Sequence, residues 1–293
     1  MPNLKEIRTR ITSVKSTQKI TSAMKMVSAS KLRHAQSTIF NLRPYSDKLN
    51  AILQNLSSSV DVSGEHPVFA KREPENVVLI VITSNKGLCG AFNSNIIKKV
   101  HHVVSENYKK QQGEGKLKLV CIGKKAIEHL QKNYDILYAN ESLLDVPDFE
   151  AVAKLSSDLM NDFNHKKTDK IAIIYNRFVN QATQKIVLEN YLPVMNPEEK
   201  FSEKIKNTNF ILEPSQQELV SELICKTLNL QLYKALLDSI ASEHGARMTA
   251  MAKATDNATE ILKELTLRYN NARQAVITNE LNEIESGAEA LKN

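Results

Sequence analysis

The two ends of the chain each carry an apolar pattern with a period of 3.5 residues, and its length constrains the fold more than any other feature. From Leu4 to Leu56, alternating steps of three and four residues reach apolar side chains at eleven of sixteen positions. The same steps from Leu237 to Val276 reach apolar side chains at ten of twelve. Such a repeat is typical of a helix whose apolar seam packs against another helix.

The length of these segments decides how they are arranged. At 1.5 Å per residue, residues 4–56 would form a helix of about 80 Å and residues 215–286 one of about 108 Å. A compact globule of this chain length would be only about 50 Å across, so both helices must project from it. Each seam needs a partner. Because one helix begins the chain and the other ends it, we predict that the N- and C-terminal helices form an antiparallel two-helix coiled coil.

The middle of the chain follows a different pattern, in which strands alternate with helices. This alternation predicts an α/β layer domain, Rossmann-like, with a largely parallel sheet and an antiparallel edge formed by its last two strands. The expected domains are an N-terminal coiled-coil helix (1–59), a linker (60–76), the α/β domain (77–210) and a C-terminal coiled-coil helix (211–293). The expected strands are Val77–Ser84, Leu117–Gly123, Lys170–Phe178 and Lys185–Tyr191, and the expected helices between them are Asn93–Lys110, Lys124–Lys132 and Asp148–His165.

Composition excludes several classes of protein. The chain has no run of about 18 uncharged apolar residues, which argues against a membrane span, and its N-terminus lacks the apolar core of a signal peptide. The three cysteines are far apart in sequence, which predicts reduced, buried thiols. The seven histidines form no ligand-like spacing with each other or with the cysteines, so we expect no metal site. We expect His244, at a seam position, to make a hydrogen bond between the two helices.

The net charge of +6 is unevenly distributed. Residues 1–46 contain nine Lys or Arg and a single acidic residue, Glu6. A basic segment of this kind indicates an acidic partner, although a solvated helix face would have the same composition.

The loop Asn85–Asn93 follows the first strand, at a position where α/β folds often hold a phosphate. It matches neither common phosphate-loop motif. A tight turn with glycine at positive φ is the favoured interpretation. Cys89 sits in a sequence that loosely imitates a nucleophile elbow, but no histidine is placed to activate it, so a buried small residue is favoured. We expect no catalytic or cofactor-binding residues.

Four consecutive positions of the N-terminal seam are polar, namely Gln18, Thr21, Lys25 and Ser28. Ile20, Met24 and Val27 form an alternative apolar line beside them. The corresponding part of the C-terminal helix is rich in small residues, from Ala241 to Ala254. The coiled coil is therefore expected to change its packing here and to offer a surface to other subunits, unless the pattern reflects a local register shift.

Three segments resemble the gamma subunits of F-type ATP synthases. They are TQKITSAMKMVSASKLRHAQ within the first helix, SNKGLCGAFN at residues 84–93, and SEHGARMTAMAKATDNA with ELTLRYNNARQAVITNELNEIESGA in the last helix. They occur in the order and spacing of that family. Residues 57–76 and 134–170 carry little of the resemblance.

The resemblance implies a central rotor shaft inside an alpha3beta3 hexamer. The α/β domain would be its foot, bound to the epsilon subunit and to the membrane c-ring. Proton flow would turn the shaft, which would drive the beta subunits through the states that make or hydrolyse ATP and regulate that activity. The chain would have no catalytic site and no cofactor, would not bind nucleic acid, and would lie on the cytoplasmic face of a bacterial plasma membrane. The family positions that meet a beta subunit correspond to Met24, Arg247, Arg273, Gln274 and Thr278, and those that meet the c-ring to Phe210 and Glu213.

Two other classes are compatible with parts of the pattern. A nucleotide-dependent α/β enzyme with a coiled-coil arm would bind nucleotide tightly as an isolated chain. A nucleic-acid-binding coiled coil would bind RNA or DNA with a steep salt dependence.

Overall fold

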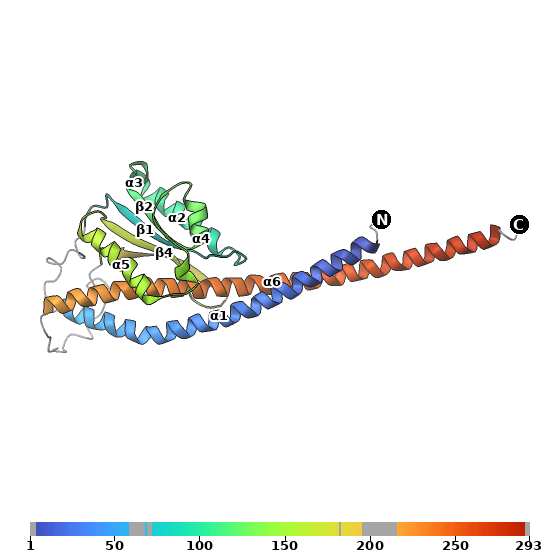
Figure 1. Ribbon diagram of the computed structural model, residues 1–293, viewed down its shortest axis with the longest axis horizontal. Coiled ribbons are helices and arrows are strands. Elements are labelled where there is room, and N and C mark those ends of the chain that lie inside the picture. The colour runs from blue at the N-terminus through green and yellow to red at the C-terminus, as the bar shows by residue number, and fades with distance from the viewer. Residues whose placement is uncertain (1–3, 59–67, 69–71, 182, 195–215, 291–293) are drawn as a thin grey trace. The chain divides into compact units, whose positions relative to one another are not determined.

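The structure, a computed structural model, describes residues 4–58, 68, 72–181, 183–194 and 216–290. It separates into two compact units, one made of Met1–Ser28 with Met248–Asn293 and the other of Ala29–Arg247. Helix α1 (Leu4–Ser58) and helix α6 (Gln216–Ala290) each contribute to both units (Figure 1). The long terminal helices predicted from the heptad patterns are therefore confirmed.

The second unit is built on a five-stranded sheet with the strand order β3-β2-β1-β4-β5. Its first four strands pair in parallel and β5 pairs with β4 in the antiparallel direction. The prediction of a largely parallel sheet with an antiparallel edge is confirmed. The strands are β1 (Val77–Ile82), β2 (Leu117–Ile122), β3 (Asp135–Asn140), β4 (Lys170–Phe178) and β5 (Gln184–Leu192).

Helices cover both faces of this sheet. Figure 1 shows α2 (Phe92–Asn107) and α4 (Lys124–Leu130) on one side, and α5 (Phe149–Asn164) with the first part of α6 on the other. Two short helices, α3 (Lys109–Gly113) and the 3₁₀ helix Ser142–Leu144, complete the unit. Asp148 caps the N-terminus of α5, because its carboxylate accepts hydrogen bonds from the N–H groups of Glu150 and Ala151 in the first helical turn.

The central strand β1 is buried along its whole length, as expected for a parallel strand covered on both faces. Alternate residues such as Leu79 and Val81 pack into a core with Ile96 of α2 and Leu119 of β2. Side chains alternate along a strand, so Ile80 lies on the opposite face, where it is also fully buried. The continuous apolar run VVLIVI in the sequence reflects these two cores.

Strand β3 was absent from the sequence-based assignment. Its residues DILYAN are mostly exposed or half-buried, and it pairs with β2 at the edge of the sheet. It therefore carries neither the apolar run of a central strand nor a clean alternation. Strand β3 belongs to the sheet because it pairs with β2, and the residues of β3 alone do not reveal that pairing.

In the first unit, α1 and α6 run antiparallel and pair through polar as well as apolar seam residues. The Gln18 side-chain amide donates to Thr259 Oγ1 at 2.8 Å, and the hydroxyls of Thr21 and Thr255 lie 2.8 Å apart. Thr21 and Ser28 are buried. The polar positions therefore continue the seam, with Lys25 as its exposed member. Ile20 and Val27 of the alternative apolar line face solvent, so the expected change of packing in favour of that line is wrong for these two residues.

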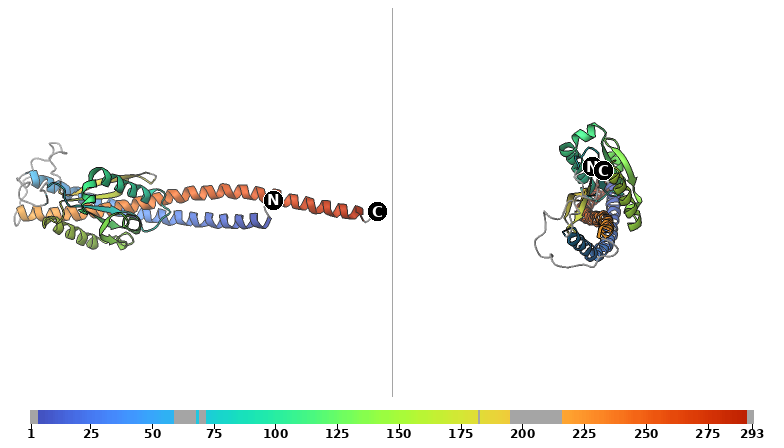
Figure 2. Two further views of the ribbon diagram at one scale, coloured as in Figure 1. Left: turned by 90° about the horizontal axis from the view of Figure 1, so that it is seen from above. Right: turned by 90° about the vertical axis from the view of Figure 1, so that its left-hand side faces the viewer.

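The last part of α6 has no helical partner among the described residues of the first unit. All sixteen residues from Arg273 to Ala288 are exposed. Figure 2 shows the helix continuing past the start of α1. Val276, Ile277, Leu281 and Ile284 expose apolar side chains there.

Candidate functional site

Small residues of α6 allow a close approach between this helix and the sheet in the second unit. A Cβ atom at Gly245 would lie 3.2 Å from the Gln181 carbonyl oxygen and 3.6 Å from the Phe178 ring, so a side chain here would press on the β4–β5 hairpin. The Ser242 hydroxyl donates to the Asn176 carbonyl at 2.9 Å. Gly245 and Ser242 thus accommodate the sheet, whereas the sequence interpretation placed these small residues opposite the polar part of the N-terminal seam.

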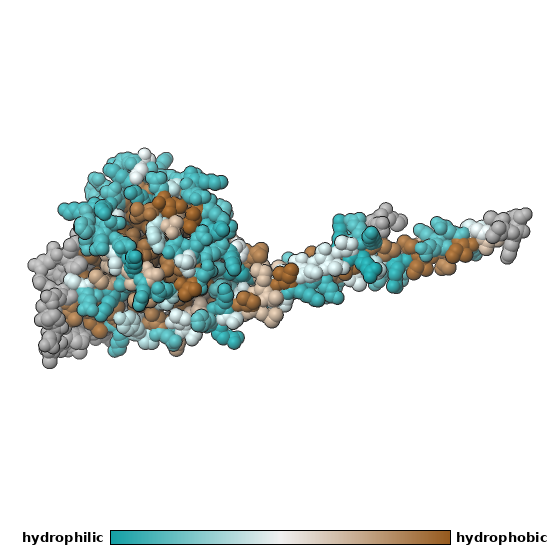
Figure 3. Space-filling view, in the orientation of Figure 1, coloured by the Kyte–Doolittle hydropathy of each residue, from teal (hydrophilic) through white to brown (hydrophobic). Residues whose placement is uncertain are grey.

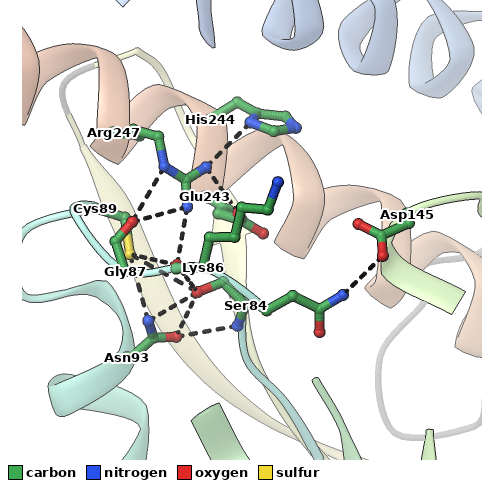
Figure 4. Close-up of polar contacts among 10 residues, drawn as sticks. Ser84, Lys86, Gly87, Cys89, Asn93, Asp145, Glu243, His244 and Arg247 are labelled. Carbon is green, nitrogen blue, oxygen red and sulfur yellow. Dashed lines mark hydrogen bonds and ion pairs between the residues drawn. The ribbon is translucent and has the colours of Figure 1, made fainter. Parts of the chain in front are cut away.

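Arg247 is the centre of a polar cluster at this contact (Figure 4). Its guanidinium forms an ion pair with Glu243 at 2.7 Å, one helical turn away. The same group donates to the Lys86 carbonyl at 3.0 Å and, from two nitrogens, to the Gly87 carbonyl at 3.2 and 3.3 Å. The side chains of Arg247 and Glu243 are 9% and 10% exposed. The cluster therefore ties α6 to the loop that follows β1.

The loop itself is held by a second layer of hydrogen bonds. The Ser84 hydroxyl donates to the Lys86 carbonyl at 2.7 Å, and the Asn93 amide bonds both Ser84 and the Cys89 thiol (Figure 4). Asn93 Oδ1 also accepts from the Ser84 backbone N–H at 3.0 Å. These contacts join the end of β1 to the first turn of α2. They fix the two carbonyl groups that Arg247 binds.

Burial controls the protonation of this cluster. It raises the pKa of Glu243 above its ordinary value, and Arg247 limits the rise. Burial, together with the charges of Arg247 and Lys31, lowers the pKa of His244 to about 4. Neutral His244 can therefore accept from Arg247, whose Nη1 lies 3.4 Å from Nδ1. This contact is within one helix, so the prediction of a hydrogen bond between helices is wrong for it.

The loop after β1 presents carbonyl oxygens where a phosphate site would present N–H groups. Those carbonyls already bind the Arg247 cation from the same chain. The turn interpretation is confirmed in part. Gly90 has a φ of 62°, but Leu88, a non-glycine residue, has a φ of 60°, and Gly87 is not among the residues with positive φ.

The surroundings of Cys89 do not favour a role as a nucleophile. It is buried, and its described polar neighbours are Ser84, Asn93 and the Lys86 carbonyl. Burial raises the pKa of its thiol, although Arg247 acts in the opposite direction. A reactive cysteine needs a lowered pKa and access to substrate.

Cys121 is also a buried free thiol, whereas Cys225 is exposed, which corrects the prediction that all three are buried.

Within the described ranges there is no group of three or more His, Cys, Asp or Glu side chains arranged to hold a metal ion. The helices in those ranges also lack any segment long and apolar enough to cross a bilayer.

The residues expected to meet a beta subunit lie in different surroundings. Met24 is half-buried on α1, whereas Arg273, Gln274 and Thr278 are exposed near the end of α6. Arg247 is buried, and its guanidinium is engaged within its own chain. Sequence reasoning missed that role, although an Arg one turn after a Glu and among small residues was a signal for it. Phe210 and Glu213, expected to meet the c-ring, lie outside the described residues.

The surface of α6 near its C-terminus combines hydrophobic and hydrophilic side chains (Figure 3). Leu281 and Ile284 are 60% and 68% exposed. Glu280, Glu283 and Glu285 alternate with them. On α1, the exposed residues of the first unit include six basic side chains, among them Lys15, Lys19 and Lys25, and one acidic side chain, Glu6. Contiguous exposed apolar surface with a polar rim marks an interaction site.

Comparison with known proteins identifies the family. The profile of the family described as "ATP synthase" matches residues 3–291. The ATP synthase gamma chain of Christiangramia forsetii is 51% identical and that of Flavobacterium psychrophilum is 49% identical, with 99% and 100% of both chains aligned.

Solved structures share the fold. A chain from the central stalk and c-ring of Tetrahymena thermophila mitochondrial ATP synthase is similar with a TM-score of 0.63 and 26% identity, over 80% of this chain and 99% of that one. A chain from the OSCP/F1/c-ring structure of Euglena gracilis mitochondrial ATP synthase has a TM-score of 0.66 and 22% identity, over 98% and 94%. The family profile and the relatives aligned over nearly their whole length establish that the chain belongs to the ATP synthase gamma chain family.

Proposed function

We propose that this chain is the central rotor shaft of a proton-translocating F-type ATP synthase. Rotation of a c-ring turns the shaft, and the shaft drives the conformational cycle of the beta subunits and regulates their ATPase activity. The observation that carries the proposal is the fully exposed final stretch of α6, Arg273–Ala288, with its unpaired apolar side chains. A helix of this kind needs a surrounding partner, and the alpha3beta3 hexamer provides one.

The exposed faces of the first unit are the proposed contacts with the hexamer. Arg273, Gln274 and Thr278 lie on the exposed stretch of α6 and would meet a loop of one beta subunit. Met24 would meet the moving part of a beta subunit beside the exposed basic residues of α1. Arg247 stays a prediction as a beta contact. Many weak, screened charge contacts suit a shaft that must slip past three similar subunits.

The α/β domain is the proposed foot. Its partners would be the epsilon subunit and the c-ring, with Phe210 and Glu213 as the c-ring contacts. The chain would then be peripheral to the membrane, on the cytoplasmic face of a bacterial plasma membrane. The bacterial relatives support this placement.

We propose that the chain has no catalytic site and binds no cofactor or nucleic acid. Support comes from the loop after β1, whose carbonyl groups bind Arg247 rather than a substrate phosphate. Support also comes from the buried Cys89, which lacks an activating base among its described partners.

Reconstitution tests the rotor function directly. The alpha and beta subunits are combined with the epsilon subunit and the membrane sector in vesicles, with and without this chain. We expect ATP-driven proton pumping and cooperative ATP hydrolysis to require the chain. Pumping that persists in its absence would refute the rotor function.

A crosslink at the exposed end of α6 tests the proposed beta contact. Thr278→Cys is joined to a cysteine in the facing beta loop, in a Cys225→Ser background that removes the exposed native thiol. Fixing the shaft should abolish coupled synthesis while nucleotide binding persists. Equal loss of both activities would argue against a shaft.

A further inference from the structure

The contact between Arg247 and the loop after β1 lies at the boundary between the two compact units. Arg247 is the last residue of the compact unit that contains the sheet, and Met248 is the first residue of the C-terminal part of the other unit. The guanidinium therefore binds the α/β domain at the point where α6 leaves it. We propose that Arg247 is a positioning residue, a clamp that transfers torque from the α/β domain to α6. This inference rests on the proposed rotor function.

The geometry of the contact resists rotation of the helix about its own axis. The guanidinium is a planar fork with fixed donor directions, and here it binds two successive carbonyls as well as Glu243. The side chain carries these bonds away from the helix axis. A hydrogen bond at a larger radius opposes a given torque with a smaller force. The pairing with Glu243 keeps the fork in this orientation.

The other side of the clamp is anchored to the centre of the sheet. The Lys86 carbonyl that binds Arg247 also accepts from the Ser84 hydroxyl at 2.7 Å, and Ser84 is bonded in turn to Asn93 of α2. Ser84 lies just beyond β1, the middle strand of the sheet. A twist of the domain therefore acts on the two carbonyls without a flexible segment between them.

Three other hydrogen bonds from α6 to the rest of this unit are of a different kind. Gln231 donates to the Asn190 carbonyl at 3.2 Å, Tyr233 to the Pro147 carbonyl at 3.4 Å, and Ser242 to the Asn176 carbonyl at 2.9 Å. Each is a single neutral hydrogen bond. Charge-assisted bonds are about twice as strong, and Arg247 follows the other three residues along α6, at the boundary of this unit. Arg247 therefore ties α6 to the α/β domain near the end of this unit, before the part of α6 that bonds α1 through Thr255 and Thr259.

A purely structural role is the alternative explanation. Removing one member of a buried ion pair destabilises a fold because the other charge stays unpaired. The two roles differ in what they change. Loss of stability reduces the number of assembled complexes, whereas loss of the clamp reduces the protons moved per ATP hydrolysed by complexes that have assembled.

The test measures this ratio in the complete complex, reconstituted in vesicles and normalised to the amount of assembled complex. For Arg247→Gln we expect the ratio of proton pumping to ATP hydrolysis to fall about twofold or more, because the charge-assisted bonds are lost. Lys226→Gln is the matched control. It removes an i,i+4 pair from the same helix and the same unit, but Lys226 and Glu222 are 52% and 62% exposed, so its ratio should equal that of the wild type.

Arg247→Lys serves where Arg247→Gln does not assemble. Lysine keeps a positive charge beside Glu243, but it lacks the fork that reaches both carbonyls. Its ratio should also fall. A ratio equal to that of Lys226→Gln, for either Arg247 variant, would overturn the clamp.

A chemical replacement of the contact provides a gain of function. Lys86→Cys and Arg247→Cys are combined in a Cys225→Ser background, and a short bismaleimide joins the two new thiols. If Arg247 acts as a clamp, crosslinking should raise the ratio of proton pumping to ATP hydrolysis above that of the same complex before crosslinking. An unchanged ratio would overturn it. Failure of the rotor function itself would be recognised separately, because pumping would then persist without the chain.

Discussion

Two stretches of the same helix, α6, have opposite environments. Ala235–Glu243, in the unit that contains the sheet, consists of nine consecutive buried residues. Arg273–Ala288, in the other unit, consists of sixteen consecutive exposed residues. Both stretches are regular helix with apolar residues at helical spacing. The comparison shows that a heptad pattern specifies a helix with an apolar face. The elements that lie beside the helix decide whether that face is covered within the chain.

The two stretches also differ in how they use small and polar side chains. In the buried stretch, Ser242 bonds the Asn176 carbonyl, and in the turn after it Gly245 lets the β4–β5 hairpin come close. The exposed stretch carries larger apolar residues alternating with glutamates. Close packing in the interior requires side chains whose shapes fit together without voids. An exposed apolar face with charged residues beside it is instead typical of a surface that a partner covers.

The largest expected effect comes from a matched pair of leucine truncations on α6. Leu236 is fully buried and Leu281 is 60% exposed. Leu236→Ala should lower the free energy of unfolding by about 3 kcal/mol, because it leaves a cavity. Leu281→Ala should change it by less than about 0.5 kcal/mol. Urea unfolding followed by circular dichroism measures both. Similar losses at the two sites would show that the isolated chain covers the exposed stretch.

A backbone substitution tests the precision of packing around the sheet. Gly123 has a φ of 106°, and a Cβ atom there would lie 2.8 Å from Leu144 Cδ1 and 2.9 Å from the Thr83 carbonyl oxygen. Gly123→Ala should destabilise the chain by about 2 kcal/mol or more. Gly87→Ala is the control, since no atom lies within 4 Å of its Cβ position. Comparable thermal stabilities for the two variants would contradict the close packing described here.

The pH dependence of stability probes the buried cluster on α6. Because the folded protein lowers the pKa of His244 to about 4 from 6.5, the unfolded chain binds more protons between these values, and stability falls as the pH drops through this window. The loss from pH 7 to pH 5 should be on the order of 1 kcal/mol. The raised pKa of Glu243 acts in the opposite direction.

The contribution of His244 is therefore obtained as a difference. His244→Gln should flatten the pH dependence relative to the wild type. Thermal unfolding at a series of pH values gives the measurement. Parallel curves for His244→Gln and the wild type would contradict the assignment.

The smallest effect concerns the polar seam of the first unit. The hydroxyls of Thr21 and Thr255 meet between α1 and α6, so a double-mutant cycle with Thr21→Val and Thr255→Val should give a coupling energy of about 0.5–1 kcal/mol. Thr9 bonds the carbonyl of its own helix, and a cycle of Thr9→Val with Thr255→Val should give none. Zero coupling between Thr21 and Thr255 would mean that their hydrogen bond adds no net stability.

Much of the fold could be predicted because its signals are local. The buried runs of β1, β2 and β4 consist mainly of apolar residues, and the heptad seams of α1 and α6 extend over many turns. Strand β3 carried no such signal, since its place depends on pairing with β2. The candidate site was less predictable. The charge of Arg247 was visible in the sequence, but the two carbonyls that it binds are 160 and 161 residues away along the chain.

The sequence by itself determined that both ends are long helices with apolar seams and that an α/β domain lies between them. The tertiary structure decided which parts of those seams are covered, which small residues face the sheet, and that Arg247 is anchored to the loop after β1. The physical reason is that helix formation and side-chain periodicity depend on neighbours in the chain. Burial and hydrogen-bond partners depend on neighbours in space, and for the end of α6 those neighbours belong to other subunits in the function proposed here.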